Sequence, residues 1–412
     1  MRFSNGYMLF YACINGYRGA WMQKNIWINL LIGSAFLFVA TEASSQPQSV
    51  SPSSDSSISP SNHVLEPLPT TVNGATPASD ASQSLLGNNA LLTGYGIASY
   101  TNREHTHGVF GAQFTPIFLY RFNDTLLWES EVNFKIHSDG ETETVLEYAS
   151  LDWFLNDYVA FVAGKFLTPL GYFTRNLHPA WINPLPSNPI GFNGNQAMPP
   201  ESEVGAQLLG ALPITDTMTL NYSVFIANGP QAGVDDGMAS EIQSETMNAV
   251  NKLYGGRIGF LPVPSLEIGV SAATSKIAFQ DSTGAIVETS SLYHVLGVDI
   301  NYHHQSWKLR AEYIQQIIPN NANSTSGTTQ GGKWYAYYSQ GSYRFSSPWE
   351  AIIRYGYYSS PQADMSQHQI TVGLDYWIME SAVAKVGYEY NTGQSASTAN
   401  DNRLIAQLAY GF

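Results

Sequence analysis

Apolar and polar residues alternate along most of this chain, from about residue 90 to the C-terminus. In the last stretch every second residue is apolar, at Leu404, Ala406, Leu408, Tyr410 and Phe412. The stretch from Leu126 to His137 shows a similar alternation, with Glu, Asn and Lys between apolar positions. Strict alternation gives an extended strand one apolar face and one polar face. The pattern therefore predicts strands that separate two different environments.

Sixteen strand-like segments follow one another, and their connections alternate in length. The segments begin near residues 90, 108, 124, 142, 157, 202, 217, 253, 265, 290, 305, 333, 348, 367, 381 and 401. Every second connection is tight, at 121–124, 156–157, 214–216, 263–265, 304–306, 346–348 and 379–381. The others are longer and polar, at 138–142, 170–201, 229–251, 281–288, 319–332, 361–366 and 391–400. Short turns at one end and long loops at the other predict an all-β protein, a transmembrane antiparallel β-barrel of sixteen strands.

Tryptophans mark the ends of several predicted strands. Five of them lie within a few residues of a short connection: Trp128, Trp153, Trp307, Trp349 and Trp377. Tryptophan is enriched where a barrel meets the interface between membrane and water. A soluble sandwich would bury its apolar faces between two sheets, without a reason to place tryptophan beside turns. We therefore predict that these five side chains form a membrane-interface girdle; ordinary core packing is the alternative for any one of them.

The first 87 residues follow a different pattern. Residues 26–40 are an apolar run preceded by Lys24, and as a helix they would measure about 22 Å, less than the roughly 30 Å hydrocarbon core. Residues 1–43 are therefore predicted to be a signal peptide region, in which Met22 is an alternative start. Residues 44–87 are rich in Ser, Pro and Thr and predict a flexible, disordered linker. The barrel domain is predicted to span residues 88–412.

Composition excludes several classes of protein. Of the 412 residues, 44% are hydrophobic, 13% are aromatic and only 12% are charged. Disorder of the whole chain needs low hydrophobicity and high charge, and helical membrane spans need about 18 consecutive apolar residues. The net charge of -14 argues against a nucleic-acid partner, which would need clustered Lys and Arg. Cys13 is the only cysteine and lies in the predicted signal, so the barrel is expected to hold no thiolate metal site and no cofactor.

Two features of the sequence resemble known outer-membrane proteins. The terminal Phe412, with Tyr410 on the same face, resembles the strand signal that such barrels present to the barrel assembly machinery. Residues 164–171 (GKFLTPLG) and 178–183 (HPAWIN) are similar to the fifth strand and constriction loop of the porin superfamily that includes the phosphate-selective porins O and P. The resemblance implies a homotrimer that forms a general or anion-preferring pore. It does not extend to phosphate selectivity, because this chain carries few basic residues for the arginine ladder of those members.

If the apolar face of each strand meets lipid, the polar face lines a lumen. A charge on the lipid face near the midplane costs roughly 2 to 4 kcal/mol, so charges are expected inside. The basic pore-lining candidates are Lys135, Lys165, Arg257, Lys308, Arg310, Arg344, Arg354, Lys385 and Arg403. The acidic candidates are Glu129, Glu131, Glu267, Asp299, Glu312, Glu350, Asp375 and Glu389. Two interpretations stay open: the charges pair across neighbouring strands and stiffen the wall, or they form a charge-separated constriction that orients solutes.

The long connection at residues 170–201 has the composition of a stiff loop. Six prolines lie in it, at positions 179, 184, 186, 189, 199 and 200. Proline fixes φ and removes a backbone donor, so such a loop can fold inward and keep its shape. We predict that it narrows the pore, with Arg175 and His178 facing lumenal Lys and Glu residues. The alternative is that it lies over the barrel rim or packs on a neighbouring subunit.

The remaining polar groups indicate no catalytic chemistry. Acidic residues gather at 139–143 and 235–245, where they are either simply solvated or bridged by divalent cations. The sequence has no nucleophile motif, HExxH pair or phosphate-cradling glycine loop, and no metal site is predicted. The chain is therefore predicted not to be an enzyme. It is predicted to be a porin embedded in bacterial outer-membrane lipid, through which small hydrophilic solutes or ions diffuse. The alternative is a loop-plugged barrel that acts as an adhesin or structural surface protein.

Overall fold

The computed structural model describes residues 89–412 except 193–197, 199, 236–237, 282, 322–330, 362–365 and 394–400. The predicted signal peptide region (1–43) and linker (44–87) lie outside the described residues.

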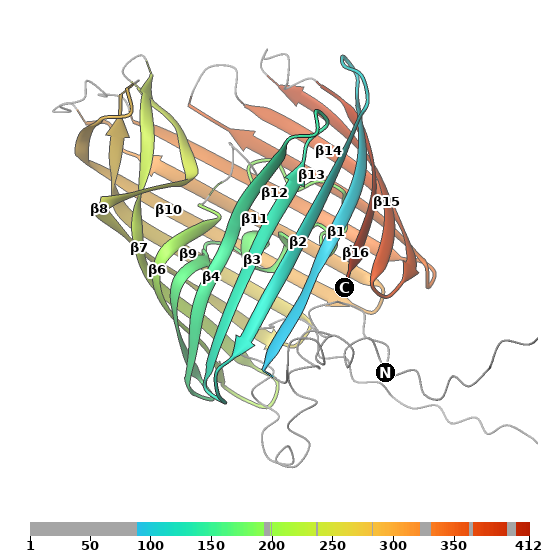
Figure 1. The fold of residues 1–412 in the computed structure, drawn as a ribbon, viewed down its shortest axis with the longest axis horizontal. Coiled ribbons are helices and arrows are strands. Elements are labelled where there is room, and N and C mark those ends of the chain that lie inside the picture. Colours follow the sequence, from blue (N-terminus) through green and yellow to red (C-terminus); the bar gives the residue numbers. More distant parts are fainter. Residues whose placement is uncertain are drawn as a thin grey trace, which may run out of the picture.

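The strands form one closed antiparallel barrel in chain order, in which β1 pairs with β16 (Figure 1). They are β1 (Ala90–Arg103), β2 (Val109–Arg121), β3 (Leu126–Ile136), β4 (Thr142–Asn156), β5 (Val159–Leu167), β6 (Ser202–Pro213), β7 (Thr219–Asp235), β8 (Met238–Val263), β9 (Leu266–Gln280), β10 (Ile286–His304), β11 (Trp307–Ile318), β12 (Gly332–Arg344), β13 (Trp349–Ser359), β14 (Gln367–Met379), β15 (Ala382–Gly393) and β16 (Arg403–Gly411). The short helix α3 (Phe173–Leu177) lies between β5 and β6. No helix among the described residues is long and apolar enough to cross a membrane.

The predicted barrel of sixteen strands is confirmed, and most strands begin within two residues of the predicted positions. The prediction was wrong for residues 229–251, which were expected to form a loop. There β7 and β8 continue as one long antiparallel hairpin, in which backbone pairing persists although the apolar alternation is lost. The acidic residues noted at 235–245 fall in this region, and their side chains are outside the described part of the structure. β10 also begins before the predicted position, at Ile286.

The two faces of the strands differ as the alternation predicts. Ile258, Val270 and Val298 are register partners on β8, β9 and β10, point outward and are 51%, 52% and 51% exposed. The adjacent Asp299 points into the lumen and is 4% exposed. A barrel wall in lipid must satisfy its backbone polar groups internally, which closure of the sheet achieves. The apolar exterior and the polar interior therefore follow from a single alternation.

Four of the predicted girdle tryptophans lie on the outer face near the short turns. Trp153, Trp307 and Trp349 are exposed there, and Trp128 takes an outward position on β3. Trp307 stacks on Tyr343 of the neighbouring strand, with 4.4 Å between the ring centroids. Their location suits the membrane interface, and a role there stays a prediction.

The prediction was wrong for Trp377, which points into the lumen. It lies between Tyr376 and Ile378, and both of these side chains are exposed on the outer face. The Arg344 guanidinium lies 5.0 Å from the centre of the Trp377 ring. Distance from a turn was therefore not enough to assign this side chain, because the position in the alternation decides which face a residue occupies.

The C-terminal residues close the barrel against β1. The backbone N–H of Gly94 donates to the Phe412 carbonyl at 3.2 Å, and the Phe412 N–H donates to Gly94 at 3.0 Å. The Phe412 ring stacks on Phe114, with centroids 5.4 Å apart. Tyr410 and Phe412 are both exposed on the outer face. Their role as an assembly signal stays a prediction.

A charged residue in place of Val270 tests which face meets lipid. We expect Val270→Lys to lower the free energy of unfolding in phospholipid vesicles by roughly 2 to 4 kcal/mol, the cost of a charge near the midplane. Val270→Ala, which removes volume from the same position without adding charge, is the control and is expected to change stability far less. Urea unfolding followed by tryptophan fluorescence measures both. Equal stability of the two variants would contradict a lipid-facing Val270.

Candidate functional site

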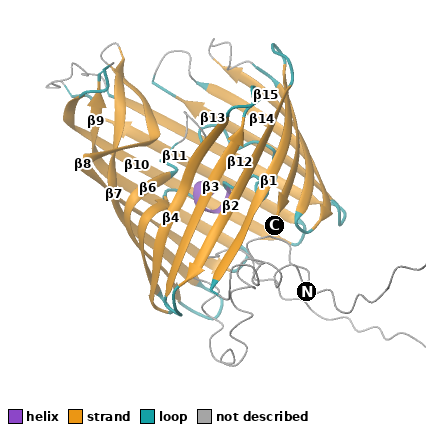
Figure 2. Cartoon of the chain, in the orientation of Figure 1, coloured by secondary structure: helices purple, strands orange, loops and turns teal. Residues whose placement is uncertain are grey.

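The chain between β5 and β6, residues 168–201, runs through the interior of the barrel and is here named the inner segment. Figure 2 shows its helix α3 inside the ring of strands. Leu170 and Phe173 are buried, and Phe173 packs edge-on against Phe192 and against Tyr338 of β12. These ring centroids are 5.9 and 6.1 Å apart. Apolar side chains of the inner segment and of strands from β5 to β13 form one buried cluster.

A carboxylate of β11 fixes the start of α3. Glu312 accepts hydrogen bonds from the backbone N–H groups of Tyr172 and Phe173, at 3.1 and 2.9 Å. The first N–H groups of a helix have no partner within it and carry a partial positive charge, so a carboxylate stabilises them. Gly171 has a φ of +91°, and a Cβ there would lie 1.8 Å from Glu312 Oε1. Glycine is therefore required at this position both by the backbone conformation and by the close approach of Glu312.

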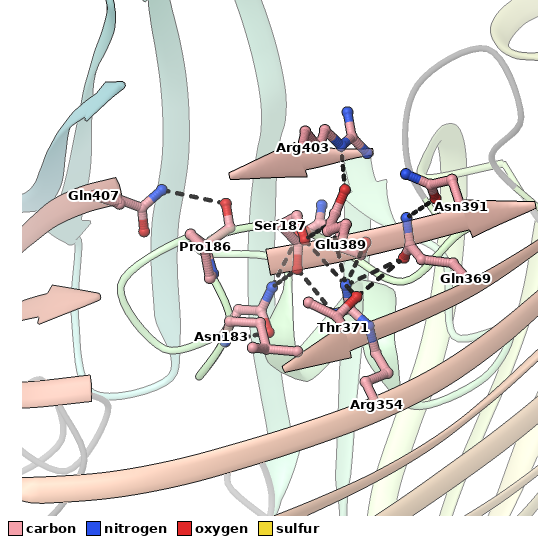
Figure 3. A network of polar contacts seen from close by, with 12 residues as sticks. Asn183, Pro186, Ser187, Arg354, Gln369, Thr371, Glu389, Asn391, Arg403 and Gln407 are labelled. Atoms are coloured by element: carbon pink, nitrogen blue, oxygen red, sulfur yellow. Dashed lines mark hydrogen bonds and ion pairs between the residues drawn. The ribbon is translucent and has the colours of Figure 1, made fainter. Parts of the chain in front are cut away.

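The backbone carbonyls of the inner segment accept hydrogen bonds from the barrel wall. The Lys385 ammonium on β15 donates to the carbonyl of Ala180, at 2.7 Å, and to that of Asn183. On β16, the Gln407 amide donates to the carbonyl of Pro186 at 3.4 Å (Figure 3). Prolines remove donors from the segment itself, so its carbonyls need partners from elsewhere. Side chains of the wall supply these donors.

Arg354 of β13 and Glu389 of β15 form a further anchor (Figure 3). The Arg354 guanidinium is 1% exposed and donates to the carbonyls of Ser187 and Asn188, at 2.8 and 3.0 Å. The Ser187 hydroxyl donates to Glu389, which also accepts from Arg403 of β16. A buried charge is costly unless its hydrogen-bonding groups are used. Groups of the inner segment therefore provide partners for the buried charges of Arg354 and Glu389. The same hydrogen bonds fix the segment to the wall.

Glycines on four adjacent strands lie against the inner segment. They lie on the lumenal faces of β13 to β16 and are here named the glycine seat: Gly356, Gly373, Gly387 and Gly411. Cβ atoms at these positions would lie 3.0, 2.4, 2.9 and 3.5 Å from side chains of, respectively, Ile190, Leu185, Pro186 and Trp181. Contacts under 3.0 Å force a neighbour to move. At Gly387 the neighbour is the rigid Pro186 ring, so a larger residue there would displace the segment from the wall, whereas at Gly373 the neighbour is the flexible end of Leu185.

Most basic pore-lining candidates lie beside carboxylates of nearby strands. The ion pairs are Arg257 with Glu267 and Asp299, Lys308 and Arg344 with Glu350, and Arg354 and Arg403 with Glu389. Arg310 donates to Asn301 at 2.9 Å, and Asp375 is the register partner of Lys385. These contacts correspond to the interpretation in which lumenal charges stiffen the wall. A charge-separated constriction stays a prediction.

The polar side of the inner segment approaches β3. His178 Nε2 lies 3.5 Å from Glu131 Oε1, and the same carboxylate accepts a hydrogen bond from the Tyr95 hydroxyl at 3.0 Å. Burial by itself lowers the pKa of His178, but the Glu131 carboxylate, together with the more distant charges of Glu147 and Glu201, raises the pKa above the usual value for histidine. His178 therefore stays protonated to a higher pH than a free imidazole. The other candidates in this region are Arg175 on α3 and Glu129 and Lys135 on the lumenal face of β3.

Lys165 was predicted to line the lumen, and the structure places it on the outer face of β5 instead. Its register partners are Ala149 and the exposed Val204, whereas the next residue, Phe166, belongs to the buried cluster. The Lys165 ammonium donates to the carbonyl of Leu146 on β4, beyond the last residue pair of these two strands. The ammonium thus has a backbone acceptor although it lies on the outer face.

The anchors of the inner segment were only partly foreseeable. The alternation placed Glu312 on the lumenal face but gave no sign that it binds a helix start. Gln407, Ser187 and the glycine seat were missed altogether. A proline-rich segment needs donors from outside, and this was the one signal that pointed toward them. Within the described part of the chain, no group of three or more His, Cys, Asp or Glu side chains could hold a metal ion.

Comparison with known proteins extends these observations. Residues 242–412 match the family model described as phosphate-selective porin O and P. OmpF of Salmonella typhi, solved with daunomycin, shares 14% identity over 79% of this chain and 98% of its own, with a TM-score of 0.54. An anion-selective porin from Comamonas acidovorans is 12% identical, with a TM-score of 0.53, and the match covers 78% of this chain and 99% of that porin. OmpT of Vibrio cholerae in a trimer form is 13% identical, with a TM-score of 0.50, and the match covers 78% of this chain and 99% of OmpT. A search of curated proteins gives no match.

The predicted resemblance to this porin superfamily is confirmed by the match over residues 242–412. The motif residues at 164–183 lie before the matched region. At identities of 12 to 14% the solved structures establish a shared fold, which is that of outer-membrane porins. The chain therefore has the fold of outer-membrane porins, and its C-terminal part, residues 242–412, is similar to the porin O and P family.

Valine in place of Gly387 tests the glycine seat. Gly387→Val places a side chain where the Pro186 ring lies, so we expect the inner segment to loosen. A cysteine at position 182, in a chain whose Cys13 is replaced by serine, reports this through its rate of modification by a membrane-impermeant maleimide. We expect the modification rate to rise about tenfold or more, which corresponds to a loss of roughly 1.4 kcal/mol from the free energy that holds the inner segment against the wall. Gly341→Val is the control, because a Cβ there meets only Leu309 at an ordinary 3.4 Å. Equal modification rates in the two variants would contradict the claim that the glycine seat holds the inner segment against the wall.

Proposed function

We propose that this chain forms an outer-membrane porin, a water-filled channel for passive diffusion of small hydrophilic solutes and ions, and that the inner segment narrows it. The observation that carries the proposal is the reach of the segment across the interior. It contacts Glu312 on β11, Glu131 on β3 and Lys385 on β15, three well-separated parts of the wall. A chain that touches the wall at such places occupies part of the cross-section, so solutes have to pass beside it.

The contacts of the inner segment favour a fixed constriction over a moving gate. Backbone donors and acceptors of the segment are used at Glu312, Lys385 and Arg354. Releasing it would leave buried charges and backbone groups without partners, which costs about 1 to 3 kcal/mol for each unsatisfied group. Its prolines restrict the conformations that it could adopt after release. We therefore propose that the pore stays at one width during permeation.

We propose only a weak ion preference. The resemblance to porins O and P implies a preference for anions, and a structurally similar porin from Comamonas acidovorans is described as anion-selective. In this chain, however, the basic side chains at Arg257, Lys308 and Arg403 lie beside carboxylates. Paired charges present little net potential to a passing ion. The pairing argues against a strong single-sign filter.

We further propose a homotrimer assembled through the barrel assembly machinery. OmpT of Vibrio cholerae, which has a similar fold, is described in a trimer form. Lys165 on the outer face supports a contact with a second subunit in this region. An ammonium that faced lipid near the midplane instead would cost roughly 2 to 4 kcal/mol. The exposed Tyr410 and Phe412 on the last strand are available to the assembly machinery.

Removal of residues 172–198 tests the constriction. We expect the single-channel conductance in planar bilayers to rise markedly, because the lumen loses the chain that crosses it. Removal of residues 105–107, which lie in the connection between β1 and β2, is the control and should leave conductance unchanged. Gel mobility with and without boiling verifies that each barrel is folded. Unchanged conductance of a folded 172–198 deletion would exclude the constriction, and absence of open steps in the unaltered protein would instead indicate a plugged barrel.

Reversal potential in a KCl gradient tests the ion preference. We expect the unaltered channel to give a potential that is a small fraction of the Nernst value of roughly 59 mV for a tenfold gradient. Glu350→Gln removes the charge shared by Lys308 and Arg344, so it should shift the reversal potential toward anion preference. Glu380→Gln, which removes an exposed charge at a short turn, is the control. A potential near the Nernst value in the unaltered protein would contradict weak selectivity.

A further inference from the structure

Aromatic side chains gather on the outer face of β11 to β14, near the long-loop ends of these strands. They come from register-paired positions of four consecutive strands and are here named the aromatic patch: Tyr313, Tyr335, Tyr337, Tyr355, Tyr357 and His368. In outer-membrane barrels the long loops are extracellular, so this end of the outer face meets the outer leaflet. The patch therefore lies where lipid headgroups adjoin the protein.

The rings of the aromatic patch touch one another in a continuous series. Tyr335 lies 6.2 Å from Tyr313 and 5.7 Å from Tyr357 between ring centroids. Tyr337 lies 6.0 Å from Tyr355 and 5.6 Å from Tyr357. The His368 ring continues the series, 4.3 Å from Tyr357. Such contacts give the outer face a broad surface of ring faces and edges.

Polar bonds hold the aromatic patch together. The Tyr355 hydroxyl and His368 Nδ1 are 2.9 Å apart, and the Tyr313 hydroxyl donates to Gln315 at 2.8 Å. The Lys333 ammonium lies 5.2 Å from the centre of the Tyr335 ring, in cation–π geometry. Lys333 is exposed at the loop end of β12, so its charge is available at the surface. The aromatic patch and the adjacent Lys333 thus combine ordered rings with one formal positive charge.

The surface below the aromatic patch is apolar. Ile353, Ile370 and Val372 lie on the outer face of β13 and β14, nearer the membrane centre, and all three are exposed. No carboxylate is found among the outward-facing side chains described at this end of β11 to β14. From the loops toward the midplane, the order is cation, aromatic rings and aliphatic side chains. A phosphorylated headgroup, its sugars and its acyl chains have the same order.

The density of the aromatic patch is not a general property of this barrel. At the short-turn end the outer face of the same strands carries separate ring pairs, such as Trp307 with Tyr343 and Trp349 with Tyr376. Elsewhere at the long-loop end, the ring contact found among the described residues is that of Tyr100 with Phe110. An ordinary interface girdle needs single aromatic residues and does not require six rings in contact. The aromatic patch is therefore denser than contact with bulk lipid requires, which favours a specific partner.

We infer that the aromatic patch is a binding site for a phosphorylated glycolipid of the outer leaflet. Sugar rings present C–H faces that pack against aromatic rings, and the tyrosine hydroxyls and His368 offer hydrogen bonds to sugar hydroxyls. Lys333 attracts the phosphate, as basic side chains at membrane surfaces do. The acyl chains lie along Ile353 and its neighbours. This lipid is held on the outside of the barrel and is separate from solutes that pass through the lumen.

Binding of purified bis-phosphorylated lipid A to the folded full-length protein in detergent micelles tests the site. Native mass spectrometry titrations give the affinity, with a dephosphorylated form of the same lipid as the matched ligand. We expect the double variant Tyr335→Ala/Tyr357→Ala to bind about tenfold more weakly, which corresponds to roughly 1.4 kcal/mol. Lys333→Gln should bind the phosphorylated lipid more weakly and lose the preference for it over the dephosphorylated form. Lys333 is exposed, so this single variant keeps the test valid if the double variant does not fold.

Tyr343→Ala is the control variant, since it removes a tyrosine from the outer face of β12 at the short-turn end. It should bind lipid A as the unaltered protein does. Equal binding of lipid A by all variants would overturn the inference. Loss of the oligomer in the double variant, with lipid binding unchanged, would also overturn it and assign the aromatic patch to contact with a second copy of the chain.

Discussion

Closure of the backbone hydrogen-bond ladder is the constraint on which this structure depends. In lipid an unpaired N–H or C=O group has no water to bond, so every strand needs a neighbour on both sides. The pairing of β1 with β16, completed by Gly94 and Phe412, removes the last free edge. Once the sheet is closed, alternation along each strand divides lipid from lumen. The apolar exterior, the polar interior and the low charge of the chain are consequences of that division.

The same requirement acts on the inner segment, which cannot form a ladder because it is rich in proline and crosses the lumen. Its backbone groups are satisfied by wall side chains instead, with Glu312 for N–H groups and with Lys385 and Arg354 for carbonyls. Many lumenal charges are therefore engaged in holding the chain or one another. These contacts hold charges of both signs in fixed positions, and their pairing is the basis of the weak ion preference proposed above.

The outer face is less uniform than an apolar belt would be. Lys165, near the end of β5, points outward and donates to the backbone carbonyl of Leu146 on β4. At the long-loop end of β11 to β14, the aromatic patch and Lys333 add a polar, ordered surface. The outer face therefore carries polar groups of its own, separate from those that line the lumen.

The sequence by itself determined the strands, their number and the face of most residues, because a period of two is a local property that each strand carries alone. It failed at residues 229–251, where backbone pairing persists without the alternation. It also failed at Lys165 and Trp377, which occupy the face that their place in the alternation gives them and not the face expected from their side-chain type. It also indicated a stiff segment at 170–201. Only the tertiary structure decided where that segment is anchored, since Glu312, Arg354 and the glycine seat lie far from it along the chain. Such contacts arise only when the closed barrel brings distant strands around one lumen.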